Sequence, residues 1–169
     1  YEASVGGGIP LIGPMKRHLQ INDISAIHTI INGTTNYILT KMERDGREFA
    51  DVLKEAQDLG YAEVDPTSDI EAFDSAYKIA ILATIAFHSD VRADDVYREG
   101  ISRIAPQDFR YAKELGYAIK LLAITKIEDN CIEARVHPAF ISADILLAKV
   151  DGVYNAVQIE GDLTGKVIL

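Results

Sequence analysis

The sequence contains a single cysteine, Cys131, among its 169 residues. One cysteine cannot form an internal disulfide, and such scarcity is typical of a reducing compartment, so we expect a cytoplasmic protein. Basic residues are also few, with 17 Lys and Arg against 26 Asp and Glu, which gives a net charge of −9. An acidic chain of this kind is a poor partner for nucleic acid or an anionic membrane surface. The composition instead suits a soluble metabolic protein.

Long apolar runs and two common binding motifs are missing as well. No uncharged run is long enough for a membrane span, and the N-terminus lacks the layout of a secretion signal. Gly6-Gly7-Gly8 is not a dinucleotide fingerprint, because no strand-length run precedes it and Pro10 and Pro14 follow where a helix should open. We expect no zinc site either, because the histidines lack the spacing of metal ligands: His18, His28, His88 and His137.

The length, residues 1–169, suits one domain with a core of its own. Helices are predicted to precede and follow strands, and the late strands join through hairpins, as with Asp129-Asn130 between two apolar runs. This order predicts an α+β fold, a mixed and largely antiparallel sheet with helices packed on one face. The predicted strands are 24–31, 120–127, 131–138, 155–160 and 165–169, and the predicted helical segments are 15–19, 34–45, 48–59, 68–88, 106–116 and 143–150.

The stretch from Ala56 to Lys78 carries the strongest functional pattern. It is rich in carboxylates before Lys78, whereas residues 79–87 carry no charge. Ser68 and Glu71 have the spacing of a capping box, so we expect a helix to start near Ser68 or Asp69. Asp74 and Lys78 then lie one turn apart on the same face, where the helix becomes apolar. A lysine at such an edge is partly desolvated, and is held by carboxylates or used as a proton donor.

The same pattern has interpretations without this chemistry. Acidic residues near a helix N-terminus are stabilised by the helix dipole, and an Asp–Lys pair four apart is commonly an ordinary surface ion pair. A magnesium site on the carboxylates is another alternative, although nothing in the sequence supplies a phosphate cradle. The carboxylates available to it are Glu63, Asp65, Asp69 and Asp74. Spacing alone leaves these alternatives open.

Three segments, in order, resemble the homoserine dehydrogenase family. They are YEASVGGGIP at 1–10, NGTTNYIL at 32–39, and the run from Ala56 to Lys78 with its GYAEVDP core at 60–66. The resemblance extends over essentially the whole chain. One departure is Ala72, where the family usually has glycine. We place Ala72 in the first turn of the predicted helix, where alanine is well tolerated.

The resemblance implies NAD(P)-dependent interconversion of L-aspartate 4-semialdehyde and L-homoserine, in the pathway to threonine, methionine and isoleucine. Lys78 would be the acid–base lysine, and Asp74 would orient it or bind substrate. Glu63 would hold the substrate ammonium group, with Tyr61 and Asp69 as pocket wall and polar network. A homodimer is implied too. The chain starts without methionine and ends on an apolar run, so we expect a piece of a longer polypeptide whose dinucleotide-binding domain and second lysine precede Tyr1.

Two glycine-containing turns complete the expected site. The amides of Gly33 and Thr34, at a helix N-terminus, can receive a substrate carboxylate. Capping by Thr34 or Thr35 alone is the equal alternative. The resemblance also implies that the loop from Tyr1 to Pro14 faces the nicotinamide near Gly7 and Gly8, although a plain connector is the structural alternative. It further implies a sodium or potassium ion, held by the side chain of Glu2 and the carbonyls of Val5, Gly7 and Ile9.

Two other classes of protein remain open. One is a structural or dimerisation domain without chemistry of its own. The other is a related two-domain oxidoreductase that acts on a different aldehyde.

Overall fold

The computed structural model describes residues 2–17, 19 and 21–169. Tyr1, the first residue of the resemblance, and His18 lie outside these ranges. Among the described residues, no helix is long and apolar enough to cross a membrane.

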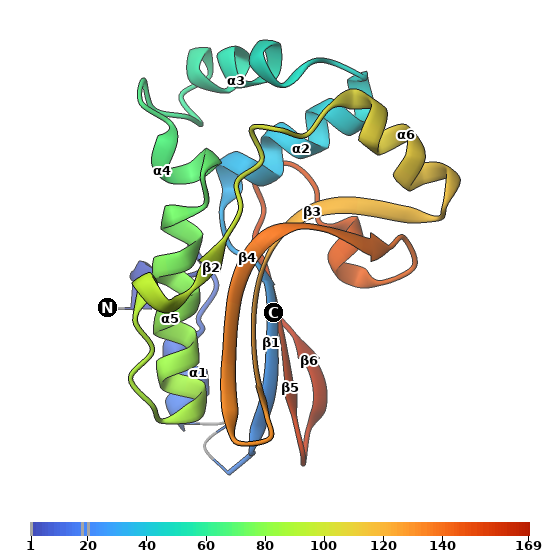
Figure 1. Cartoon of the computed structure of the whole chain (residues 1–169). Coiled ribbons are helices and arrows are strands. Elements are labelled where there is room, and N and C mark those ends of the chain that lie inside the picture. The colour runs from blue at the N-terminus through green and yellow to red at the C-terminus, as the bar shows by residue number, and fades with distance from the viewer. Residues whose placement is uncertain (1, 18, 20) are drawn as a thin grey trace.

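One six-stranded sheet forms the centre of the structure, with the strand order β2-β4-β3-β1-β5-β6 (Figure 1). Neighbouring strands are antiparallel except β2 and β4, which are parallel. The strands are β1 (Ile24–Ile30), β2 (Tyr97–Arg98), β3 (Tyr117–Glu128), β4 (Cys131–Ser142), β5 (Ala156–Gly161) and β6 (Gly165–Ile168). The prediction of an α+β fold with a mixed, largely antiparallel sheet is confirmed.

The helices surround this sheet on one face and at one end. Helix α5 packs along β1, β3 and β4, with α1 beside it, while α2 and α6 lie across the end of the sheet (Figure 1). The helices are α1 (Ile12–Arg17), α2 (Gly33–Asp45), α3 (Phe49–Asp58), α4 (Thr67–Ile70), α5 (Phe73–Phe87) and α6 (Pro106–Glu114). The described residues also form the short 3-10 turns η1 (Glu2–Ser4), η2 (Ala93–Asp95) and η3 (Leu146–Lys149).

Strand β3 is buried on both faces, which explains its nearly continuous apolar sequence. Leu121 faces the larger core with Ile79 and Leu82 of α5. Leu122, the next residue, faces the smaller cluster with Leu147 of η3. The predicted β3–β4 hairpin is confirmed, and its turn residues Asp129 and Asn130 both have positive φ, 49° and 63°. Two left-handed residues match the twist of the flanking strands.

The long helix predicted from Ser68 to His88 is wrong as a single element. Helix α4 ends at Ile70, Ala72 adopts a left-handed conformation with φ 63°, and α5 starts at Phe73. Ser68 lies inside α4 and caps neither helix. The turn before α4 is instead closed by Asp65, whose carboxylate accepts the amide and hydroxyl of Thr67 at 3.1 and 2.6 Å. Placing Ala72 in the first turn of a helix was therefore also wrong.

Three other expectations differ from the structure. The N-cap of α2 is Asn32, rather than Thr34 or Thr35, because the Asn32 side chain accepts the Thr35 amide. The helix predicted over 143–150 is only the 3-10 turn η3. Strand β2 has two residues and was not predicted, since so short a segment has no detectable alternation.

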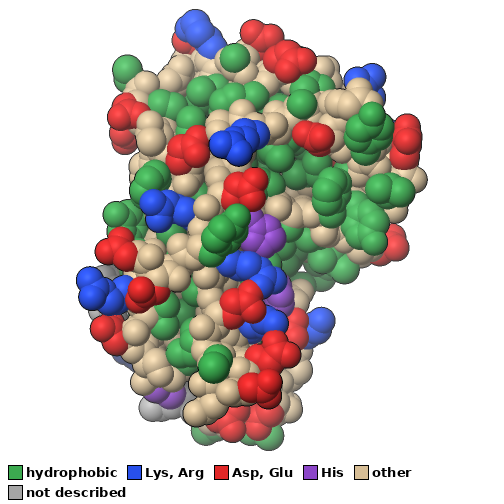
Figure 2. Space-filling model, in the orientation of Figure 1, with side chains coloured by type: hydrophobic (Ala, Val, Ile, Leu, Met, Phe, Trp, Pro, Cys, Tyr) green, Lys and Arg blue, Asp and Glu red, His purple; other side chains and the backbone are tan. Residues whose placement is uncertain are grey.

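Charged groups of both signs are scattered over the visible surface, and hydrophobic side chains gather at the right, over α6 and the end of β4 (Figure 2). Three exposed apolar residues belong to this region, Leu115, Tyr117 and Phe140. The rings of Tyr117 and Phe140 meet edge to face with centroids 6.3 Å apart. An exposed apolar patch of this kind is typical of a surface that another polypeptide covers.

Candidate active site

Asn32, between β1 and α2, is the centre of a polar cluster. Its side-chain oxygen accepts the Thr35 amide at 2.9 Å, which caps α2. Its side-chain nitrogen donates to Asp69 at 2.7 Å and to Asp74 at 2.9 Å. Asn32 is only 5% exposed, so each of its polar contacts is made at a fixed geometry. One asparagine thus joins the start of α2, the end of α4 and the first turn of α5.

Lys78 lies beside this cluster. Its ammonium nitrogen is 2.6 Å from Asp74 and 3.3 Å from the Ile31 carbonyl oxygen, to which it donates. The side chains of Lys78 and Asp74 are 24% and 29% exposed, so the pair is partly shielded but still reachable from solvent. The expectation that Lys78 sits at the edge of an apolar helix, held by a carboxylate, agrees with these contacts.

Tyr61 and Thr34 are held on the same side of the structure. The Thr34 hydroxyl donates to the Tyr61 carbonyl oxygen at 2.7 Å, which ties the loop after α3 to the first turn of α2. The Tyr61 ring lies against the Tyr37 ring at a tilt of 50°, with centroids 4.9 Å apart. The Tyr37 hydroxyl in turn donates to Glu55 at 2.6 Å. The predicted pocket wall is therefore supported from α2 and α3.

Glu55 and Tyr37 have strongly shifted pKa values. Hydrogen bonds from Tyr37 and Arg47 lower the pKa of Glu55 to about 2. Burial and the bond to Glu55 raise the pKa of Tyr37 to about 12. Both groups therefore keep one protonation state through the neutral range, which makes them a fixed support and not a proton relay.

Glu63, the predicted partner of the substrate ammonium group, is exposed, and its side chain does not join the cluster. Its backbone carbonyl accepts the Gln57 side chain at 3.0 Å. Its carboxylate makes no polar contact with Asp74 or Lys78 among the described residues. In the part of the chain that the structure describes, no three or more His, Cys, Asp or Glu side chains form a group that could hold a metal ion, so the carboxylates of the magnesium alternative do not converge on one point.

Glu2 binds backbone amides at the start of α1. Its carboxylate accepts the amides of Leu11, Ile12 and Gly13 at 2.5, 2.7 and 2.8 Å, at the start of α1. The interior of the loop turns at Gly6 and Gly7, both with positive φ, 81° and 61°.

The glycines that were predicted to lie near ligands have different surroundings: Gly33 is close to another part of the backbone, whereas Gly8 faces open space. A methyl group on Gly33 would lie 2.7 Å from the Val153 carbonyl oxygen, so only glycine fits there. A methyl group on Gly8 would meet nothing within 4 Å. Gly33 therefore marks contact with another segment of the chain, while Gly8 leaves a surface that a ligand can approach.

Asn32 is the residue of this cluster for which the sequence predicts no role at the site. It lies within the NGTTNYIL segment, and a polar residue directly between a strand and a helix is the usual signal of an N-cap. Its second contact, with two carboxylates far along the chain, has no sequence signal. The cluster has two carboxylates and one ammonium group, an arrangement that attracts a positively charged ligand group and can also provide a proton.

The chain is thus an α+β domain with a carboxylate–lysine cluster in the first turns of α5. A sequence model described as homoserine dehydrogenase matches residues 10–169. The chain belongs to the homoserine dehydrogenase family.

Individual relatives agree. The chain is 48% identical over 168 residues to the homoserine dehydrogenase of Helicobacter pylori, and the aligned part covers 99% of this chain and 40% of the relative. It is 50% identical over 168 residues to that of Neisseria gonorrhoeae, covering 99% and 39%.

Solved structures give the same result. The homoserine dehydrogenase of Thiobacillus denitrificans has a TM-score of 0.97 at 50% identity, covering 99% of this chain and 39% of that one. A hyperthermophilic archaeal homoserine dehydrogenase mutant in complex with NADPH has a TM-score of 0.82 at 32% identity, covering 100% and 48%. The chain thus spans about 40% of the length of the curated relatives.

Proposed function

We propose that this chain forms the substrate site of an NAD(P)-dependent homoserine dehydrogenase, which interconverts L-aspartate 4-semialdehyde and L-homoserine. The observation that carries the proposal is the contact of Lys78 with Asp74 beside the Asn32–Asp69 hydrogen bond. Membership of the family supports the choice of reaction, and the cluster supplies a proton donor, Lys78, next to acidic side chains.

In the reducing direction, the aldehyde carbon gains a hydride and its oxygen gains a proton. NAD(P)H supplies the hydride when it is bound. Lys78 gives the proton to the aldehyde oxygen, and Asp74 keeps the ammonium group in place. Lys78 then regains a proton from solvent, which reaches it because its side chain is partly exposed.

The rest of the substrate is held by its charges. The substrate ammonium group binds near Asp69 and Glu63, because a carboxylate is the natural partner of a cation. For Glu63 this requires its exposed side chain to turn toward the ligand. The substrate carboxylate is received by the amides of Gly33 and Thr34, which as the first residues of α2 have no partner within the helix. Tyr61 forms the wall.

The glycine loop fits a nicotinamide and a monovalent cation in different ways. Gly7 and Gly8 allow close approach of a cofactor ring, because Gly8 faces open space. The Glu2 side chain and the carbonyls of Val5, Gly7 and Ile9 form an oxygen-only set, which suits sodium or potassium. The three amides on Glu2 already fix its carboxylate, so a cation would bind to a loop that is ordered beforehand.

The test is an assay of the full-length enzyme that contains this chain. We expect oxidation of NAD(P)H with aspartate semialdehyde, and no turnover by residues 1–169 alone, because these residues carry no dinucleotide-binding fingerprint. Lys78→Ala should lower kcat at least ~100-fold, the usual scale for an acid–base group. Lys54→Ala on the exposed face of α3 is the control. Near-normal turnover of the Lys78 variant would remove this residue from the mechanism.

Assembly and location are proposed on the family resemblance. We propose a cytoplasmic homodimer that binds neither nucleic acid nor membrane. The exposed apolar residues Leu115, Tyr117 and Phe140 support a second copy as partner. Light scattering of the full-length enzyme should give twice the monomer mass, and a monomer at micromolar concentration would contradict this.

A further inference from the structure

Lys120 is a charged residue in the interior that the mechanism above does not use. It lies in β3 and is 0% exposed. By strand alternation it shares a face with Ala118 and Leu122, which belong to the smaller apolar cluster. A lysine enclosed among apolar side chains must be compensated by specific partners, because desolvation of its charge is costly.

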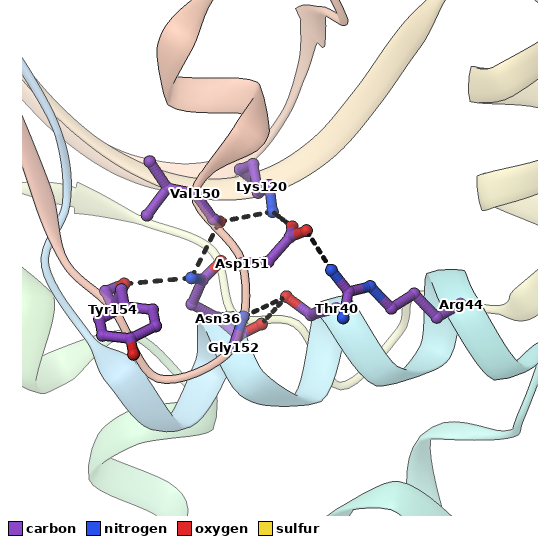
Figure 3. A network of polar contacts seen from close by, with 8 residues as sticks. All are labelled: Asn36, Thr40, Arg44, Lys120, Val150, Asp151, Gly152 and Tyr154. Atoms are coloured by element: carbon purple, nitrogen blue, oxygen red, sulfur yellow. Dashed lines mark hydrogen bonds and ion pairs between the residues drawn. The ribbon is translucent and has the colours of Figure 1, made fainter.

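Its partners lie on the segment 150–154, which follows η3. The Lys120 ammonium group donates to the Val150 carbonyl at 2.8 Å and to the Asp151 carboxylate at 3.0 Å (Figure 3). Asp151 also contacts Arg44 of α2 at 2.6 Å. Burial tends to raise the pKa of Asp151, but the bonds and charges of Lys120 and Arg44 outweigh it and lower this pKa. Asp151 is thus an anion held between two cations.

The same segment is fixed along one stripe of α2. The Asn36 side chain donates to the carbonyls of Val150 and Tyr154, both at 3.1 Å. The Gly152 amide donates to the Thr40 hydroxyl at 3.0 Å. Asn36, Thr40 and Arg44 are four residues apart and point to the segment together (Figure 3).

One turn before Asn36, this stripe reaches Gly33. There the segment lies directly against the backbone of the helix. A methyl group added to Gly33 would lie only 2.7 Å from the Val153 carbonyl oxygen. No side chain separates the two backbones at this point. The position of Val153 therefore sets where the first turn of α2 can lie.

Stability alone does not account for a lysine at this position. Replacing a buried ion pair by apolar residues of similar volume is often neutral or stabilising. What the charge adds is a unique arrangement, since Lys120 needs one particular carbonyl and one particular carboxylate. We propose that Lys120 is a positioning residue. Through the segment 150–154 it fixes the amides of Gly33 and Thr34 that, in the proposed function, receive the substrate carboxylate.

The experiment compares Lys120→Met with Lys149→Met in the full-length enzyme. Methionine keeps an unbranched apolar side chain and lacks only the position of the ammonium group, and Lys149 is an exposed lysine one residue before the same segment. We expect Lys120→Met to raise KM for homoserine at least ~10-fold while kcat changes less than ~3-fold, since small displacements of a binding group have large effects. A merely structural loss would lower the active fraction and leave KM unchanged.

A second ligand sharpens this readout. L-homoserine amide lacks the carboxylate but keeps the ammonium and hydroxyl groups. The wild type should prefer homoserine strongly, and Lys120→Met should lose most of this preference, whereas Lys149→Met should keep it. Unchanged preference and unchanged KM in Lys120→Met would overturn the proposal.

Two further arms keep the proposal testable. Hydrogen exchange of the Gly33, Thr34 and Thr35 amides should be faster in Lys120→Met than in Lys149→Met, and equal exchange would overturn the inference even if the wild type had no homoserine activity. Wild-type inactivity would by itself refute only the proposed function. If Lys120→Met does not fold, Thr40→Val, which removes only the hydroxyl on Gly152, should give the same KM effect in smaller size.

Discussion

The side-chain nitrogen of Asn32 lies 2.9 Å from the carboxylate of Asp74, 42 residues further along the chain. The same asparagine caps α2 with its oxygen. Helix capping and orientation of the lysine-bearing helix α5 are therefore combined in one side chain. A change at this position acts on the geometry around Lys78 without touching Lys78 itself.

Substitutions of Asn32 should separate these two tasks. Serine and aspartate both cap helices about as well as asparagine. Asn32→Ser loses both donor bonds to the carboxylates, and Asn32→Asp in addition places a third carboxylate beside Asp69 and Asp74. We expect kcat/KM to fall ~10-fold or more for serine and further for aspartate, on the scale of bonds to charged groups. Steady-state kinetics with matched thermal melts measure this, and equal activity of the aspartate variant and the wild type would contradict it.

Because Ala72 is left-handed, we expect its replacement by glycine to have an unusually small effect on stability. Its methyl group is fully buried, so Ala72→Gly loses about 0.8 kcal/mol of burial and some chain entropy. Relief of the left-handed conformation returns about 1–2 kcal/mol, so stability should change by less than about 1 kcal/mol. Ala76→Gly, at an equally buried position inside α5, lacks this relief and should cost about 2 kcal/mol. Urea unfolding measures both, and equal losses would refute the explanation.

Glu55 predicts a specific sensitivity to acid. Its pKa in the folded chain, about 2, lies below the ordinary value of 4.5. A carboxyl whose pKa is depressed by folding contributes stability above its unfolded pKa, and this contribution is lost as the pH falls through the folded value. Glu55→Gln should therefore reduce the loss of unfolding free energy between pH 4.5 and pH 2. Denaturation series at pH 7, 4 and 3 measure this, and parallel curves for variant and wild type would be the contrary result.

His28 predicts a second pH dependence, near neutrality. Burial lowers the pKa of His28 below 6.5, with the charges of Lys166 and Arg135 in the same direction and Glu160 opposing. Its Nδ1 atom has no hydrogen-bond partner among the described residues. Because folding disfavours the charged form, stability is greatest above the unfolded pKa and falls as the pH drops below about 6.5. Replacement by glutamine should remove this component between pH 7.5 and 5.5, as followed by thermal melts.

Local patterns predicted most elements but not their long-range contacts. The alternating and periodic apolar residues of β3, β4 and α2 define elements by themselves, and Asp129-Asn130 is a turn on local grounds. The break at Ala72 was missed because alanine favours a helix, and tertiary contacts override that preference. The Gly100 region shows one such contact, since the Ile101 amide donates to the Ile70 carbonyl at 2.8 Å and ends α4. The sequence carries no sign of this bond.

The site shows the same division. Lys78 and Asp74 are four apart, so their pairing follows from helix geometry and could be predicted. The contacts of Asn32 with Asp69 and of Lys120 with Asp151 join segments distant in sequence, and only the folded chain brings them together. The predicted partnership of Glu63 with this cluster stays a prediction, because its carboxylate lies on an exposed loop.

The interruption between α4 and α5 also allows the carboxylates of Asp69 and Asp74 to meet. On one continuous helix, residues five apart such as Asp69 and Asp74 would be turned by about 140° from each other around the axis. A single amide could not then reach both. The left-handed conformation of Ala72 changes the chain direction between the two helices. The carboxylates of Asp69 and Asp74, which a continuous helix would direct apart, therefore both reach Asn32. A substitution that joined α4 and α5 into one continuous helix would separate these two carboxylates, although both side chains would still be present.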